Sequence, residues 1–265
     1  MAIRMIATDL DGTLLDPENR ISEENKAALR EAAEKNICVT IATGRMYCSA
    51  LPYAKEIGVD APIITYNGAL VKTTAGEELS SSCIEPEDVR AVLDFMRRKG
   101  WHVQVYSDDR LYFVERDKCA CSYEENAGIQ GEAVGWDGLY AHVERVHKLL
   151  SITDVPEEMA GRLTELEKAF SGRISPVRSK PCYLDITAPG VSKAQSLRRL
   201  AESRGIAPEE VLALGDSDND IAMLSSVGIG VAMTTGTKGA CAAARFLVEN
   251  EAADGVARAV RAHAF

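Results

Sequence analysis

Two aspartates near the N-terminus stand in the segment Asp9-Leu10-Asp11-Gly12-Thr13, which follows a short apolar run. That run, Ile3 to Ala7, is too short for a helix and ends near a glycine turn, so it predicts a buried strand. Carboxylates two residues apart at the exit of a strand can face the same way. Like charges that close are unfavourable unless a cation or a shared proton compensates them. The pair therefore indicates either a cation site or an ordinary Asp-Gly turn.

A second acidic segment, Gly215-Asp216-Ser217-Asp218-Asn219-Asp220, again follows an apolar run, Val211 to Leu214. Its alternating aspartates resemble the start of a calcium-binding loop. That interpretation fails, because Ile221 replaces the required glycine and Val227 stands where the loop needs a bidentate glutamate.

The two acidic segments make better sense together. If their strands are adjacent, Asp9, Asp11 and Asp216 converge on one point. A few hard oxygen ligands that leave room for water and a phosphate suit Mg²⁺. One carboxylate could then attack phosphorus to form an aspartyl-phosphate, while the other moves the proton to the leaving oxygen and from water.

Donors for a phosphate stand elsewhere in the chain. Thr43 supplies a hydroxyl and Gly44 an unencumbered backbone N–H. Lys193 lies in the first turn of a predicted helix capped by Ser192, where free N–H groups favour an anion. A lysine there normally opposes the helix dipole, so its placement makes more sense if it meets a negative group, while an ordinary solvated lysine stays open as the alternative.

The elements that must position these residues alternate between strand and helix. Ser22 caps a helix running to Asn36, and strands are predicted at 37–42 and 63–66. Such alternation predicts a parallel sheet, whose ligands gather beyond the carboxyl ends of the strands. The segments at Asp9, Thr43 and Asn67 all follow strands and should share that edge. Further strands at 211–214, 229–232 and 246–248 and a final helix from about Gly255 complete this core.

The pattern changes near residue 84. Pro86 begins a helix stopped by Gly100, with apolar residues at the helical period. A hairpin is then predicted at 102–115, and further strands and a helix follow before residue 187. The prediction is an α/β chain: a Rossmann-like, doubly wound parallel core at 1–84 and 188–265, with an α+β cap domain inserted at 85–187.

Composition narrows the partners. The chain of 265 residues carries a formal net charge of −10, which argues against nucleic acid or an anionic membrane. Seven irregularly spaced cysteines suit a reducing compartment, and Cys119-x-Cys121 lacks the second pair that a metal site would need. No stretch approaches the roughly 18 apolar residues of a membrane span. We expect a soluble, cytoplasmic protein, a monomer or weak homodimer.

Taken in order, these segments resemble the four motifs of the haloacid dehalogenase superfamily: Asp9-Leu10-Asp11-Gly12-Thr13, Thr43, Lys193 and Gly215 to Asp220. The insertion between the second and third motifs is similar to that of its Cof-type, class IIB capped phosphatases. So are three short segments, Ile41-Ala42-Thr43-Gly44-Arg45, Asn67-Gly68-Ala69 and Gly190-Val191-Ser192-Lys193. The resemblance spans residues 3 to about 260.

The resemblance implies a role for each matching residue. Asp9 would be nucleophile and Mg²⁺ ligand, and Asp11 the general acid and base, also binding metal through its carbonyl. Thr43 and Lys193 would contact the phosphoryl oxygens, and Asn219 would orient the phosphate. Asp216 would bind the metal directly, and Asp220 would support the metal through water.

The expected function is a Mg²⁺-dependent phosphatase for a small phosphate monoester, such as a sugar phosphate or pyridoxal phosphate. Two alternatives stay open, a phosphomutase and a sugar-phosphate sensor with incidental hydrolysis. The chain departs from the family at Met233-Thr234-Thr235-Gly236, where relatives often carry Gly-Asn-Ala, so contacts made there in relatives should not be assumed.

Overall fold

The computed structural model describes residues 2–58, 61–250 and 252–265. Two compact units divide the chain. The core unit comprises Met1–Thr43, Ala50–Ser80 and Ser192–Phe265, and the inserted unit comprises Gly44–Ser49 and Ser81–Val191.

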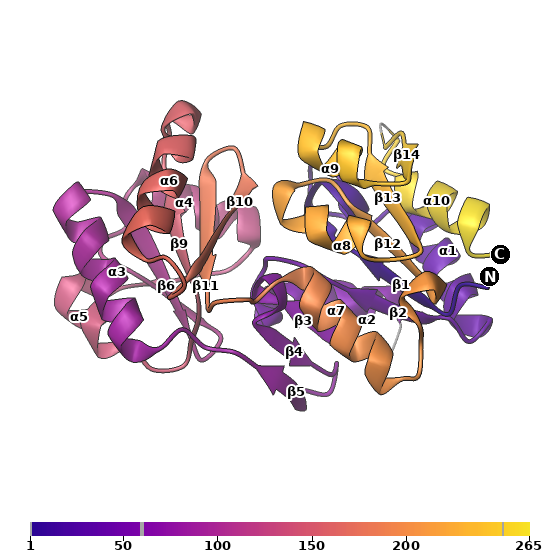
Figure 1. The fold of residues 1–265 in the computed structure, drawn as a ribbon, viewed down its shortest axis with the longest axis horizontal. Helices are drawn as coiled ribbons and strands as arrows, with labels where there is room; N and C mark the ends of the chain where they lie inside the picture. The colour runs from indigo at the N-terminus through magenta and orange to yellow at the C-terminus, as the bar shows by residue number, and fades with distance from the viewer. Residues whose placement is uncertain (1, 59–60, 251) are drawn as a thin grey trace. The chain divides into compact units, whose positions relative to one another are not determined.

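A five-stranded sheet with every neighbouring pair parallel forms the centre of the core unit (Figure 1). Its order is β14-β13-β12-β1-β2. Because β2 lies on one side of β1 and β12 to β14 on the other, the direction of winding reverses between β1 and β12. The strands are β1 (Met5–Thr8), β2 (Cys38–Ile41), β12 (Val211–Gly215), β13 (Ile229–Met233) and β14 (Phe246–Val248).

Helices cover both faces of this sheet. Met5 and Ala7 of β1 pack in one apolar cluster with residues of α7, α8 and α9. The alternate residues of β1 face the other side, where α1 and α10 pack together and α10 contacts β12, β13 and β14. The bounds are α1 (Glu23–Glu34), α7 (Lys193–Ser203), α8 (Ile221–Ser225), α9 (Lys238–Ala243) and α10 (Gly255–His263).

The strand predicted at 63–66 differs from the expectation in its length and in the sheet to which it belongs. It ends at Thr65 as β3 (Ile63–Thr65) and belongs to a separate three-stranded sheet with β4 (Leu70–Lys72) and β5 (Glu78–Ser81). An isolated parallel bridge between Ala42 and Ile64 joins it to the residue that follows β2. A tight turn, Tyr66–Gly68, returns the chain so soon after β3 that β4 pairs with it in antiparallel fashion.

Helix α2 (Tyr47–Ile57) was not predicted, because Pro52 lies inside it and breaks the usual helical pattern. Short 3₁₀ turns also occur at Pro156–Glu158, Pro208–Glu210 and Asp218–Asp220. Within the described part of the chain, no helix has the length and apolar character needed to cross a membrane.

The inserted unit is built on a six-stranded mixed sheet of order β10-β11-β9-β6-β7-β8. Its neighbouring strands are antiparallel except β7 and β8. The predicted hairpin is present as β6 and β7. The strands are β6 (His102–Ser107), β7 (Arg110–Phe113), β8 (Glu132–Ala133), β9 (Val146–Ile152), β10 (Ser175–Lys180) and β11 (Tyr183–Thr187).

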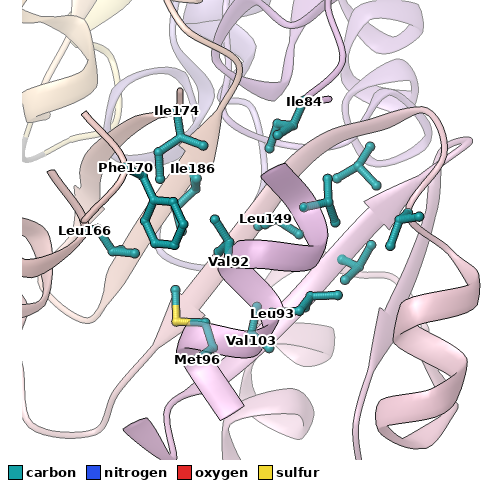
Figure 2. Close-up of a cluster of buried hydrophobic side chains, with 14 of the residues drawn as sticks. Ile84, Val92, Leu93, Met96, Val103, Leu149, Leu166, Phe170, Ile174 and Ile186 are labelled. Carbon is teal, nitrogen blue, oxygen red and sulfur yellow. The ribbon is translucent and has the colours of Figure 1, made fainter. Parts of the chain in front are cut away.

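Helix α3 (Pro86–Lys99) packs its apolar stripe on this sheet and ends at Gly100, whose φ of 66° is left-handed. Figure 2 shows Val92, Leu93 and Met96 of this helix against Val103 and Leu149 of the sheet. The remaining helices are α4 (Lys118–Ala127), α5 (Gly135–Ala141) and α6 (Met159–Ala169). The two units together confirm the predicted α/β fold with a parallel core and an inserted α+β part.

Candidate active site

Two neighbouring strands deliver the two acidic segments. β1 pairs with β12 in parallel, Thr8 opposite Leu214, so Asp9 and Asp216 leave the sheet at the same edge. The Asp9 N–H still donates to the Leu214 carbonyl, 3.0 Å away, which fixes where the nucleophile candidate leaves the strand. This edge is also the point at which the winding of the sheet reverses, the usual ligand position in such folds.

Three carboxylates converge there. Asp9, Asp216 and Asp220 each offer an oxygen, and these oxygens lie within 4.8 Å of one another. Asp9 is only 4% exposed and Asp220 is fully buried. The group contains Asp220, to which the family resemblance gave only a role through water, and it does not include Asp11, whose side chain is half-buried.

The close approach of these segments requires Gly12. Its φ of 77° is left-handed, and a Cβ there would lie 2.6 Å from Asp216 Oδ2. The Thr13 hydroxyl, one residue on, donates to Asp216 Oδ1 at 3.1 Å, and the Ser217 hydroxyl donates to Oδ2 at 3.0 Å. The Asp216 carboxylate is therefore held by two hydroxyl groups.

Lys193 connects the carboxylates. Its Nζ lies 2.7 Å from Asp9 Oδ1 and 2.7 Å from Asp220 Oδ1, and its side chain is fully buried. The Ser192 hydroxyl caps α7 by accepting from the Gln195 N–H, as the sequence predicted, and so fixes the turn that carries the lysine. The second oxygen of Asp220 accepts the backbone N–H groups of Asp216 and Ser217.

The electrostatics of the site follow from burial and an excess of negative charge. Burial raises the pKa of Asp9 well above its usual range, and the nearby Asp220, Asp216 and Asp11 add to this against the opposing effect of Lys193. Burial and Asp220 raise the pKa of Asp216 to about 6. Burial lowers the pKa of Lys193, but the charges of Asp220 and Asp9 outweigh it and the net pKa is raised.

This donor set fits a divalent cation. The three oxygen-bearing groups are hard ligands, and their mutual repulsion is the kind that a bound Mg²⁺ relieves. Asp9 and Asp216 would hold the ion, with Asp220 beside them.

Two other predicted binding residues meet at the turn of Asn67, a segment that the sequence analysis placed at the ligand edge without naming Asn67 as a site residue. Thr43 follows β2, is fully buried, and accepts the backbone N–H of Asn67 at 3.0 Å. The Asn219 Nδ2 donates to Asn67 Oδ1 at 2.8 Å. Asn67 therefore links Thr43 to Asn219, and the Asn-Gly pair at the end of a strand was the signal for it.

Gly44 belongs by its contacts to the inserted unit. Its carbonyl accepts a hydrogen bond of 2.8 Å from Lys148 Nζ in the same unit.

The atypical loop after β13 packs against Asp216 through its backbone. The Thr237 N–H donates to the Asp216 carbonyl at 2.7 Å, and a Cβ at Gly236 would lie 2.5 Å from that oxygen. This loop therefore holds the main chain of Asp216, the residue whose carboxylate belongs to the site.

Comparison with known proteins decides the family. A family model for haloacid dehalogenase-like hydrolases matches residues 6–260. The chain belongs to that family. The resemblance drawn from the four motifs is therefore confirmed, and this hydrolase is an enzyme of the phosphatase class.

Curated relatives of this hydrolase and solved structures similar to it agree with this family. It is 28% identical to the 5-amino-6-(5-phospho-D-ribitylamino)uracil phosphatase YcsE of Bacillus subtilis, over 98% of this chain and 95% of that protein. A haloacid dehalogenase-like hydrolase from Bacteroides thetaiotaomicron is 27% identical, with a TM-score of 0.87 over 98% of this chain and 99% of the other. The subclass IIB sugar phosphatase BT4131 is 25% identical, with a TM-score of 0.85 over 98% of each chain.

Proposed function

We propose that this chain is a Mg²⁺-dependent phosphatase that hydrolyses a small phosphate monoester through an aspartyl-phosphate on Asp9. The observation that carries the proposal is the buried group in which Lys193 bridges Asp9 and Asp220 beside Asp216. One ammonium and three carboxylates leave an excess of negative charge that a cation and the substrate's phosphate can organise.

The chain's own residues account for each bond. The Asp9 carboxylate attacks phosphorus, and the bond from phosphorus to the leaving oxygen breaks as Asp11 protonates that oxygen. Asp11, now ionised, then takes a proton from water, whose oxygen attacks the same phosphorus. The acyl-phosphate bond breaks, inorganic phosphate leaves, and Asp9 returns to its carboxylate form.

Lys193 favours the first step because its ammonium, 2.7 Å from Asp9 Oδ1, stabilises the ionised form that attacks. Thr43, Gly44 and Asn219 would bind and orient the phosphoryl oxygens. A bound Mg²⁺ would neutralise charge on the phosphoryl oxygens.

The substrate class is a small phosphorylated metabolite. The named activities of YcsE, on a ribitylaminouracil phosphate, and of BT4131, on sugar phosphates, support a sugar phosphate or a cofactor phosphate such as pyridoxal phosphate. The inserted unit would act as the cap that selects the leaving group and excludes water.

The test is chemical trapping. The wild type is mixed with Mg²⁺ and with acetyl phosphate or a sugar phosphate that is radiolabelled in its phosphoryl group. After acid quenching, label should remain on the protein. Hydroxylamine should then release the label, because it cleaves acyl phosphates. Asp9→Asn should carry no label. Rapid hydrolysis with no labelled protein would contradict the covalent route, whereas no turnover of any phosphate ester would contradict the function itself.

A further inference from the structure

The turn Tyr66–Gly68 connects three separate parts of the candidate site within the core unit. The Asn67 N–H donates to the Thr43 carbonyl at 3.0 Å, and Asn67 Oδ1 accepts from Asn219 Nδ2 at 2.8 Å. The Gly68 carbonyl accepts from the Ser196 hydroxyl in the first turns of α7 at 2.8 Å. Residues of the second and fourth motifs, and of the helix that begins at Lys193, therefore bond to two successive residues of this turn.

The backbone of the turn is strained in a way that ordinary turns avoid. Tyr66, Asn67 and Gly68 have successive φ values of 52°, 56° and 103°. A bulky residue such as tyrosine rarely adopts a positive φ, and such conformations persist only where the surroundings enforce them. Tyr66 is fully buried and Asn67 is 3% exposed, so packing holds both in place.

Gly68 shows how closely the turn approaches α7. A Cβ at this position would lie 2.4 Å from the Ser192 carbonyl oxygen. Ser192 is the N-cap of α7, and the next residue is Lys193. The turn is thus seated directly on the segment that aims the lysine at Asp9.

One side-chain atom of Asn219 has no hydrogen-bond partner among the described residues. Its Oδ1 is buried and lacks a hydrogen bond, although its Nδ2 is engaged by Asn67. A buried amide oxygen without a partner is costly, and such atoms are usually completed by water or a ligand. The bond from Asn67 fixes the rotation of this amide and therefore the direction in which the remaining atoms point.

We propose that Asn67 is a positioning residue for the phosphate site, whose side chain holds the Asn219 amide in the orientation that the transferring phosphoryl group requires. This inference rests on the proposed function. It adds a residue outside the acidic motifs, acting through Asn219 and not on the reacting atoms.

Asn67→Gly tests the proposal cleanly, because glycine keeps the left-handed backbone and removes only the side-chain amide. With p-nitrophenyl phosphate and Mg²⁺ we expect kcat to fall about tenfold with a smaller change in KM, in a protein that stays folded but is somewhat less stable because the buried bond to Asn219 is lost. Asn219→Ala should lose at least this factor, because it also removes the amide that would contact the phosphate. The double variant should lose no more than Asn219→Ala alone, because both single changes remove the same interaction.

Losses that multiply in the double variant, or an Asn67→Gly protein with wild-type kcat, would overturn the proposal. A wild type without turnover would instead overturn the proposed function, and with it this inference.

A glycine pair provides an independent test of the turn. Gly68→Ala and Gly76→Ala both place alanine at a positive φ, 103° and 94°, but a Cβ at Gly76 meets nothing within 4 Å. We expect Gly76→Ala to keep wild-type kcat and Gly68→Ala to lose at least as much as Asn67→Gly. Equal kcat in the two alanine variants, both folded, would show that the seating of the turn on α7 does not matter to the reaction.

Discussion

Both units bury charged side chains, but they combine the charges differently. In the inserted unit, Lys148 Nζ lies 3.0 Å from Asp185 Oδ1, and each side chain is 3% exposed. In the core unit, one buried ammonium, Lys193, bridges two carboxylates, and a third lies beside them.

The difference separates a pair that can satisfy itself from a group that needs something more. A buried pair of one cation and one anion can be neutral and hydrogen-bonded. Three carboxylates around one ammonium raise the pKa values of Asp9 and Asp216, because burial and mutual repulsion both penalise ionisation. Repulsion between buried carboxylates of this kind indicates a site completed by a cation and a substrate.

The largest effect is expected from a variant that removes the proposed nucleophile from the charged group of the core unit. Asp9→Asn keeps the shape of the side chain and can still accept from Lys193, but it cannot form the acyl phosphate. We expect kcat for p-nitrophenyl phosphate to fall by about 10⁴-fold or more, with the fold intact by circular dichroism. Activity within tenfold of the wild type would remove Asp9 from the mechanism.

Removal of the cation should come next in size. Chelation with EDTA should lower kcat/KM by at least about 100-fold, and added Mg²⁺ should restore it. Mg²⁺ at about 100 times its Kd should also stabilise the wild type by about 2.7 kcal/mol.

Two variants of one acidic segment serve as a matched pair for the metal. Asp216 belongs to the converging group, whereas Asp218, two residues along, does not. Asp218→Asn should keep the thermal shift with Mg²⁺, and Asp216→Asn should lose most of it. Equal shifts in the two variants would argue against a cation at this position.

The balanced pair of the inserted unit should behave as a structural element. Lys148→Met leaves the buried Asp185 without its ammonium and should cost about 3–5 kcal/mol of unfolding free energy. Lys148→Met combined with Asp185→Leu should recover much of this loss, because no buried charge then remains unpaired. Urea denaturation measures both, and a double variant that adds a further loss would contradict the interpretation.

The smallest effect concerns the excess charge itself, in metal-free protein. Asp216 titrates near 6 in the fold against a usual 3.8, so its raised pKa disfavours folding as pH rises. The penalty is absent below about pH 3.8, grows between 3.8 and 6, and is complete above about 6, at no more than about 3 kcal/mol.

Asp216→Asn in EDTA should therefore be more stable than the wild type at pH 8, and this advantage should shrink toward pH 4. Denaturation across this pH range tests it, with Asp218→Asn as the control. An Asp216→Asn protein less stable than the wild type at pH 8 would show that burial and the charge of Asp220 do not penalise the ionised form of Asp216 in the fold.

Local interactions explain what the sequence could predict. Short apolar runs marked β1 and β12, serines 22 and 192 marked the helix caps, and Gly100 marked the end of α3. These signals act over a few residues, so they can be read without knowing the fold. The motifs supplied the family in the same way, since each is a short segment in a fixed order.

The fold was less predictable where a local signal was weak or misleading. Pro52 concealed α2, the mixed polar composition of α4 gave no strong helical period, and α5 is short and contains two glycines. The segment after Ala42 looked like another strand of the parallel sheet, but the left-handed turn at Tyr66–Gly68 directs the chain into a separate antiparallel pair.

By itself, the sequence determined the elements, the family and the short list of acidic and basic residues from which the site is made. Tertiary structure alone decided how they combine: Lys193 reaches Asp9 across 184 residues, Asp220 joins the carboxylate group, and Asn67 connects Thr43 to Asn219. The physical reason is the range along the chain over which each kind of interaction acts. Propensity and capping act along the chain, whereas buried charge is balanced or left in excess only by residues that folding brings together.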